Sequence, residues 1–150
     1  MDLSSGPSAK PWIQPRAAYL HVPFCRHRCG YCNFSVVSGR DEWIERFLDA
    51  IDQELAWIDR PSVQTVFLGG GTPTHLDLRG LERLLRMVRA RFDFDDDVEW
   101  SIEANPEDVT REKLALLVDH GVNRISLGVQ SFDGKKLATL QRGHDRAAAI

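Results

Sequence analysis

Apolar residues recur along this chain with two alternating spacings, one typical of buried strands and one typical of amphipathic helices. Short apolar runs predict strands over residues 17–22, 63–68, 98–102 and 122–129. Apolar side chains at three- and four-residue steps predict helices over residues 44–58, 81–92 and 114–118, and a short one over 137–140. Strands and helices therefore alternate along the chain.

Alternation with short connections favours parallel βα units joined by right-handed crossovers. A doubly wound sheet and a barrel both remain open on this pattern, although a complete eight-unit barrel needs about 250 residues. In either architecture, ligands gather at the carboxyl ends of the strands. Functional residues are therefore expected in the turns that follow the strands.

Capping and breaking residues mark the ends of the predicted helices. Asp41 and Thr110 stand where a side-chain oxygen accepts hydrogen bonds from the first N–H groups of a helix, and Asp77 precedes the helical pattern over residues 81–92. Pro61 and Gly121 follow the ends of two of these helices. We therefore expect each helix to begin directly after its capping residue.

The two ends of the chain differ from its middle. Residues 1–16 are rich in serine, glycine and proline without periodicity, which predicts a loose leader. Residues 17–150 hold all the predicted elements, and Asp145 has the position of an N-cap for a last helix without a capping signal at its other end. We therefore expect this chain to be a fragment, the N-terminal portion of a larger domain.

Composition narrows the classes of function. The chain has 150 residues, 43% hydrophobic and 27% charged, without a low-complexity run, which indicates one globular domain. A net charge of −3 gives no basic footprint for nucleic acid, so no nucleic-acid partner is expected. No apolar run resembles a signal peptide or reaches the length of a transmembrane segment, and a cytoplasmic location is expected.

All three cysteines of the chain, Cys25, Cys29 and Cys32, lie close together in the spacing CxxxCxxC, which predicts a metal-ligand set. A structural zinc ion needs a fourth ligand, for which His21 or His27 is available. An iron–sulfur cluster is held by closely spaced thiolates, and a four-iron cluster on three cysteines leaves one iron open for chemistry. A disulfide between two of the cysteines would leave the third as a free thiol. The spacing favours the cluster.

The segment from Tyr19 to Phe24, followed by CxxxCxxC, resembles the cluster loop of the radical S-adenosylmethionine (SAM) superfamily. The resemblance implies a 4Fe-4S cluster on the three cysteines, with its open iron chelated by the amino and carboxylate groups of SAM. The cluster's electron then cleaves the sulfonium to give a 5'-deoxyadenosyl radical. The resemblance also implies an α/β fold, the N-terminal part of a partial (β/α)6 TIM-like barrel with parallel strands, of which this chain would hold four units.

Gly70, Gly71 and Thr72 follow the second predicted strand. Alone, these residues indicate either a tight turn or a backbone that a ligand approaches closely. By resemblance they are the GGTP segment that contacts the amino group of SAM. Tyr19 and the backbone of Tyr31 are the remaining contacts that the resemblance implies near the cluster.

Glu103, Gln130 and Arg142 follow the later strands, and alone each would be typical of a solvated surface position. Glu103 lies in SIEANP and Gln130 in RxSxGVQSF, segments that resemble one subgroup of the superfamily in which these side chains contact SAM. By resemblance Arg142 pairs with the carboxylate of SAM, a group that a guanidinium can bind through two hydrogen bonds.

These segments resemble the oxygen-independent coproporphyrinogen oxidase-like group. One branch decarboxylates coproporphyrinogen III, and another binds heme and delivers it to acceptor proteins. The oxidase branch carries a further cysteine two positions after the third, where this chain has Phe34. We therefore predict a heme chaperone whose partners are heme or porphyrin, a heme-acceptor protein and an electron donor such as flavodoxin or ferredoxin. The oxidase is the first alternative, and a zinc-stabilised binding module is the second.

Overall fold

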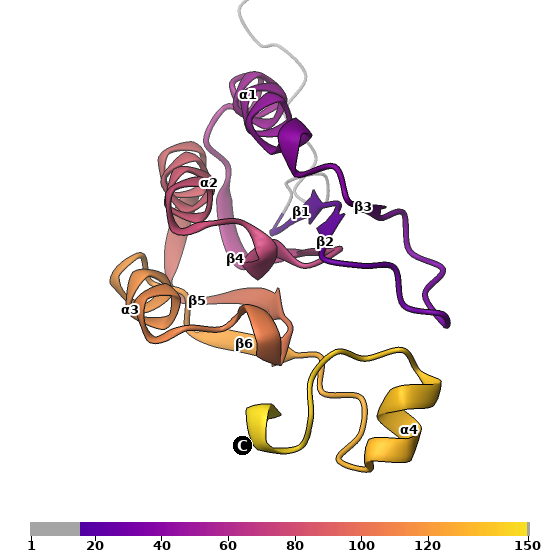
Figure 1. Ribbon diagram of the computed structural model, residues 1–150. Helices are drawn as coiled ribbons and strands as arrows, with labels where there is room; N and C mark the ends of the chain where they lie inside the picture. Colours follow the sequence, from indigo (N-terminus) through magenta and orange to yellow (C-terminus); the bar gives the residue numbers. More distant parts are fainter. Residues whose placement is uncertain (1–15, 150) are drawn as a thin grey trace, which may run out of the picture.

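Four parallel strands form the main sheet of the computed structural model, which describes residues 16–149 (Figure 1). Hydrogen-bonded side by side in this order, they are β1 (Ala17–Val22), β4 (Ser62–Gly70), β5 (Asp93–Ala104) and β6 (Arg124–Leu127). The connections between them carry α1 (Ile44–Leu55), α2 (Leu78–Arg91) and α3 (Arg111–Asp119).

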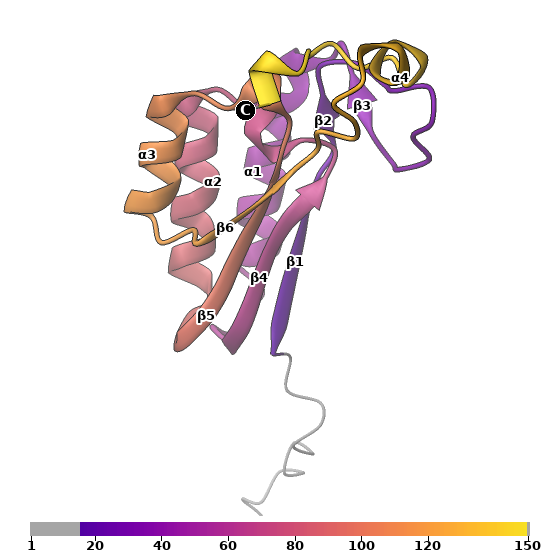
Figure 2. The ribbon, with the colours of Figure 1, turned by 90° about the horizontal axis from the view of Figure 1, so that it is seen from below.

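The helices α1, α2 and α3 all cover the same face of the sheet (Figure 2). The spatial order of the main strands follows their order in the chain, without the reversal that marks a doubly wound sheet. A doubly wound sheet would also carry helices on both faces. The described residues therefore form an arc of a βα barrel, and the doubly wound alternative is excluded for them.

A layer of apolar side chains between the sheet and the helices forms the core. Alternate residues of a strand point to opposite faces, so every second residue of the central strands enters this layer. The strands contribute the fully or almost fully buried Val66, Leu68, Trp100 and Ile102. The helices contribute Leu48, Leu81, Leu84, Leu85 and Val88, which are all fully buried. This packing fixes the strands on which the site residues depend.

Thr110 is confirmed as a capping residue, and Asp77, which precedes the predicted helix, caps its helix as well. The side chain of Asp77 accepts a hydrogen bond from Gly80 N at 2.7 Å at the start of α2. Thr110 accepts one from Lys113 N at 3.2 Å at the start of α3. Each side-chain oxygen satisfies an N–H group that has no partner inside the helix. Gly121 also has the predicted role, because its φ of +93° lies in the left-handed region that ends a helix.

The prediction that Asp41 caps a helix is wrong. Asp41 begins a single 3-10 turn, Asp41–Trp43, and α1 then starts at Ile44 with no side-chain cap. The Asp41 carboxylate instead accepts a hydrogen bond from His75 Nε2 at 3.0 Å. A bond between a carboxylate and a histidine that can carry charge is stronger than a neutral one, and it draws the side chain away from the helix.

The third strand is longer than its apolar pattern. β5 begins at Asp93 instead of the predicted residue 98, because its first residues already pair with the start of β4. A register shift between Val63 and Thr65 separates this pairing from the rest of the ladder. The acidic residues Asp95, Asp96 and Asp97 lie at this irregularity. They interrupt the apolar pattern, so the start of β5 could not be predicted from it.

The last part of the described chain follows its prediction more loosely. β6 covers only the middle of the predicted strand 122–129, and α4 (Gly134–Thr139) is the predicted short helix. Asp145 does cap the last turn, because its Oδ1 accepts from Ala148 N at 2.9 Å. That turn, Ala147–Ala149, is a 3-10 turn and not the predicted α-helix.

At the other end, the predicted loose leader lies outside the described residues except for Arg16. The carbonyl oxygen of Arg16 accepts from Gln64 N at 2.8 Å, so this residue already belongs to the edge of the sheet. Among residues 16–149, no helix combines the length and the apolar character needed to cross a membrane.

Replacing a core leucine of α2 tests the packing. Leu84 is fully buried, so Leu84→Ala is expected to lower the free energy of unfolding by about 2–5 kcal/mol through lost contacts and a residual cavity. Leu78 on the same helix is 43% exposed, and Leu78→Ala is expected to change the free energy of unfolding by less than about 1 kcal/mol. Urea unfolding followed by circular dichroism measures both. Equal losses for the two variants would contradict the assigned core.

Candidate functional site

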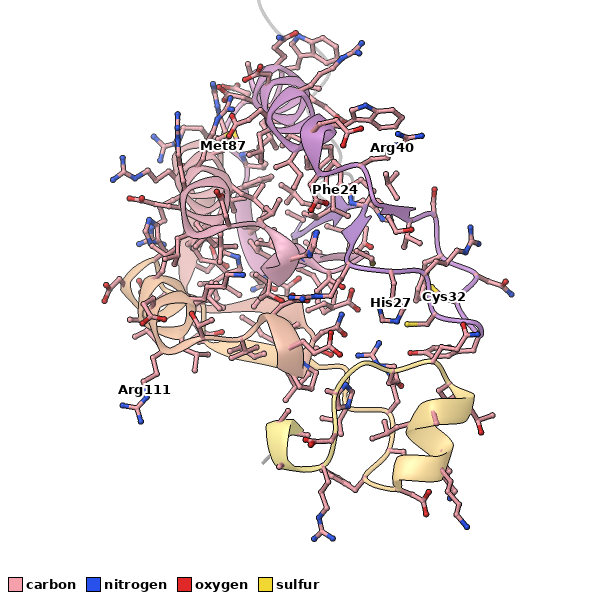
Figure 3. All side chains as sticks on the ribbon, viewed as in Figure 1. Phe24, His27, Cys32, Arg40, Met87 and Arg111 are labelled. Atoms are coloured by element: carbon pink, nitrogen blue, oxygen red, sulfur yellow. The ribbon has the colours of Figure 1, made fainter. Side chains whose placement is uncertain are left out.

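A cavity of about 360 Å³ opens at the carboxyl ends of the strands, between the cysteine loop that follows β1 and the segment that carries α4. In Figure 3 the side chains of His27 and Cys32 lie between these two parts of the chain. All the site residues predicted from the sequence except Tyr19 line this cavity: Cys25, Cys29, Tyr31, Cys32, Gly70, Gly71, Thr72, Glu103, Gln130 and Arg142.

The cysteine loop is closed at its base by a short parallel pair of strands, β2 (Phe24–Cys25) and β3 (Val37–Ser38). Strands of two residues are too short to carry a periodic pattern, so neither was predicted from the sequence. At the tip of the loop, Cys32 N donates to Cys29 O at 3.0 Å and forms a turn. The pair and the turn together hold the three thiols around one cavity.

Gly70 and Gly71 are required by the packing of the protein itself. A Cβ atom on Gly71 would lie 2.6 Å from the backbone C and O atoms of Pro23. At Gly70 it would lie 2.5 Å from ring atoms of His21, and Gly70 also has a φ of +111°. The sequence suggested that these glycines leave room for a ligand. The structure gives another reason, which is close contact with the cysteine loop and with β1.

The N–H groups of this turn are already bonded within the protein. Gly70 N donates to Glu103 Oε2 at 2.9 Å, Gly71 N to Val22 O at 2.8 Å, and Thr72 N to Phe24 O at 2.8 Å. An anionic group would therefore find no free amide here. What the turn and Glu103 offer to the cavity are carbonyl, hydroxyl and carboxylate oxygens, which are acceptors for a cationic amino group.

Two glutamines with left-handed backbones lie beside the cavity. Gln130 has a φ of 64° and Gln141 a φ of 54°, a region that residues other than glycine rarely occupy. Gln130 lines the cavity. Gln141 accepts a hydrogen bond from His27 Nε2 through its carbonyl oxygen at 2.7 Å, which joins the cysteine loop to the end of α4. Gln141 was not predicted as a site residue.

Tyr19 and Tyr31 differ in their relation to the cavity. Tyr31 lines it, and burial together with the nearby Cys29 raises the pKa of its phenol against the effect of Arg142. Tyr19 lies outside it and lines a second hollow between β1 and α1. Its hydroxyl is 3.3 Å from His21 Nδ1, and burial and then the charge of Glu103 raise its pKa. Its role as a ligand contact stays a prediction.

Arg142 is the most closely held side chain of the site. Its Nη2 donates to Asn105 Oδ1 at 2.6 Å and to Gly128 O at 2.7 Å, and its Nη1 donates to Cys29 Sγ at 3.3 Å. Asn105 in turn donates from Nδ2 to Thr72 Oγ1 at 2.9 Å. Sequence reasoning missed Asn105, although it lies in the same SIEANP segment as the predicted glutamate.

The residues around the cavity suit a cluster better than a single metal ion. Among residues 16–149, no three cysteine, histidine, aspartate or glutamate side chains converge on a point where one ion could be held. His21 and His27, the candidate fourth ligands of zinc, each bond a backbone carbonyl through Nε2. A four-iron cluster needs no such convergence, because its cysteines bind different irons. The buried Nε of Arg142 has no hydrogen-bond partner and is available to an anionic group.

Residues 19–150 match the family description Radical SAM superfamily. The chain belongs to this superfamily. The match covers the cysteine loop and every strand end that lines the cavity. Membership of the radical SAM superfamily implies a 4Fe-4S cluster and SAM as cofactors.

Several curated relatives carry the name heme chaperone HemW. The Bacillus subtilis (strain 168) protein is 39% identical over 134 residues, which cover 86% of this chain and 35% of that protein. The Mycobacterium tuberculosis (strain H37Rv) protein is 43% identical over 145 residues, which cover 91% and 37%. The chain thus spans about a third of the length of these relatives.

A solved radical SAM structure resembles the whole described fold. It is coproporphyrinogen III oxidase (HemN) from Escherichia coli, which superimposes with a TM-score of 0.81 at 32% identity. The superposition covers 91% of this chain and 32% of that one. The similarity confirms the fold class that was predicted from the sequence, a parallel α/β arc of a TIM-like radical SAM barrel.

A buried carboxylate lies behind the cysteine loop of this radical SAM domain. Asp108 is 4% exposed, and its Oδ1 accepts from Arg26 Nη2 at 2.9 Å. His75 Nδ1 lies 4.0 Å from the same Oδ1. Burial acts to raise the pKa of Asp108, but His75 and Arg26 together outweigh it and hold the pKa below its usual value. Asp108 raises the pKa of His75 against burial, and Asp41 adds to the rise.

This arrangement predicts a pH-dependent stability of the cluster-free protein. Because folding raises the pKa of His75, its contribution is fully present below its unfolded pKa of about 6.5 and is lost as the pH rises through the higher folded value. The difference in free energy of unfolding between the wild type and His75→Asn should therefore shrink as the pH rises above about 6.5. Urea unfolding at several pH values measures it.

Asp41→Asn provides the matched comparison, because it removes the exposed partner of His75 and leaves Asp108 in place. The free energy of unfolding of Asp41→Asn should depend on pH less than that of the wild type and more than that of His75→Asn. If the difference in free energy of unfolding between the wild type and His75→Asn stays constant as the pH rises above about 6.5, His75 is not the source of the pH dependence.

Proposed function

We propose that Cys25, Cys29 and Cys32 hold the 4Fe-4S cluster and that the rest of the cavity binds SAM. The observation that supports this most strongly is that the CxxxCxxC thiols share one cavity with Glu103 and Arg142 at the strand ends. Residues 17–150 would then be the N-terminal portion of a radical SAM core domain.

Opposite charges in the cavity wall suggest how SAM is oriented. The carboxylate of Glu103 and the oxygen atoms of the Gly70–Thr72 turn accept hydrogen bonds from its amino group. The guanidinium of Arg142 binds its carboxylate. Gln130, Tyr31 through its backbone, and Tyr19 complete the contacts with the remainder of the ligand. When bound, the cluster supplies one electron, and this polar cradle keeps the sulfonium group next to it.

For the whole protein, we propose the function of a heme chaperone, which binds heme or porphyrin and delivers it to acceptor proteins in the cytoplasm. The name of the HemW relatives and their identity of 39% and 43% support this. Phe34 supports it as well, because the oxidase branch has a cysteine at this position. An electron donor such as flavodoxin or ferredoxin would reduce the cluster.

The second candidate is an oxygen-independent coproporphyrinogen III oxidase. The TM-score of 0.81 with the Escherichia coli oxidase favours it, since the two structures share the same arc of the barrel. A shared fold does not imply a shared reaction, however. The solved oxidase is also less identical to this chain, at 32%, than the two HemW relatives.

Anaerobic reconstitution with iron and sulfide tests the cluster. The reduced full-length protein is expected to give the electron paramagnetic resonance (EPR) signal of a four-iron cluster, and SAM is expected to change that signal. Cys29→Ala should lose the signal because a ligand is missing. Ser35→Ala on the same loop does not alter the cavity lining and should keep it. One zinc per chain with no cluster in the wild type would contradict the proposal.

Two assays on the reconstituted protein separate the candidate activities. A heme chaperone is expected to bind heme in a saturable titration and to leave coproporphyrinogen III unchanged in the presence of SAM and a reductant. Decarboxylation of coproporphyrinogen III that depends on Cys29 would favour the oxidase instead. The Ser35→Ala protein should behave like the wild type in both assays.

A further inference from the structure

A chain of hydrogen bonds runs around the wall of the cavity and joins two of the cysteines. Cys25 Sγ lies 3.5 Å from Thr72 Oγ1, which accepts from Asn105 Nδ2 at 2.9 Å. Asn105 Oδ1 accepts from Arg142 Nη2 at 2.6 Å, and Arg142 Nη1 donates to Cys29 Sγ at 3.3 Å. Asn105 stands at the centre of this path.

An asparagine suits this position because its amide has a donor and an acceptor that face different partners. The donor engages the buried hydroxyl of Thr72, which is 3% exposed, and the acceptor engages Arg142. Its backbone is extended, with φ −102° and ψ 147°, and the following Pro106 disfavours the helical alternative. Both the backbone and the amide plane of Asn105 are therefore fixed.

The fixed amide determines where the Arg142 guanidinium points. Its Nη2 is held between two acceptors, Asn105 Oδ1 and Gly128 O. Because the guanidinium is planar and rigid, these two hydrogen bonds direct Nη1 toward the Cys29 sulfur. Hydrogen bonds to the cysteine sulfurs and nearby positive charge are among the factors that set the reduction potential of an iron–sulfur cluster.

We propose that Asn105 is a positioning residue that holds Arg142 against the Cys29 sulfur and so raises the reduction potential of the cluster. The inference rests on the proposed function, because it requires a cluster bound at Cys29. It adds a second role to Arg142, which then serves both the carboxylate of SAM and the cluster. Asn105 itself does not have to contact the SAM carboxylate or the cluster.

Redox titration of the reconstituted full-length protein, followed by EPR, tests this role. Asn105→Asp keeps the size and the acceptor but loses the donor to Thr72 and places a negative charge against the guanidinium. Asn105→Ala removes both bonds. Both variants are expected to shift the midpoint potential to more negative values. Asn105→Ala should also weaken SAM binding about tenfold, which is the order expected for one hydrogen bond to a charged group.

Asn123→Ala is the matched control. Asn123 also makes two side-chain hydrogen bonds to β5, to Trp100 N at 2.9 Å and Val98 O at 2.8 Å, but it does not line the cavity. The Asn123→Ala variant should lower the melting temperature of the protein without changing the midpoint potential of the cluster. In an Arg142→Lys background, Asn105→Ala should cause no further shift, because the positioning residue acts through Arg142.

The outcomes separate this inference from the proposed function. A wild type with a four-iron signal whose potential and SAM affinity are the same in both Asn105 variants would overturn the positioning role alone. A shift in Asn105→Ala that persists undiminished in the Arg142→Lys background would also overturn it. A wild type that assembles no four-iron cluster would overturn the proposed function and this inference with it.

Discussion

The contact on which the rest of the site depends is the approach of the turn after β4 to the start of the cysteine loop. The hydrogen bonding between β1 and β4 continues past both strands, through Gly71 N to Val22 O and Thr72 N to Phe24 O. A side chain at Gly71 would collide with the backbone of Pro23, so only glycine permits this approach. It brings Thr72 to Cys25 and thereby fixes the loop relative to the sheet.

The cations next to the cysteines are each held by acceptors of the protein. Arg26 is bound by the buried Asp108, and Arg142 by Asn105 and Gly128 O. The pKa of the Cys25 thiol is nevertheless raised, because burial outweighs the hydrogen bond with Thr72. Asn105 and Gly128 belong to the wall of the cavity, so Arg142 is held at this wall beside Cys29. The same anchoring binds the cysteine loop to the ends of β5 and β6.

The strands and helices could be predicted because their signals are local. Thr110 and Asp145 cap their turns as expected, since each cap and its N–H partner lie within a few residues. Asp41 was misread because its partner, His75, belongs to a different βα unit. The start of β5 was missed because acidic residues at a register shift interrupt the apolar pattern. Errors of this kind arise wherever tertiary contacts override a local preference.

The site was predictable as far as single segments resemble known ones, and less so where residues act through one another. Glu103 could be named from its segment, but the role of Asn105 exists only because β4, β5 and the segment after α4 meet at one cavity. The left-handed backbones of Gln130 and Gln141 likewise depend on tertiary contacts and not on the local sequence. Each is unfavourable by itself and persists because its surroundings hold it, as His27 holds the carbonyl of Gln141. Residues that position others are therefore found from contacts, and a sequence pattern identifies mainly the residues that they position.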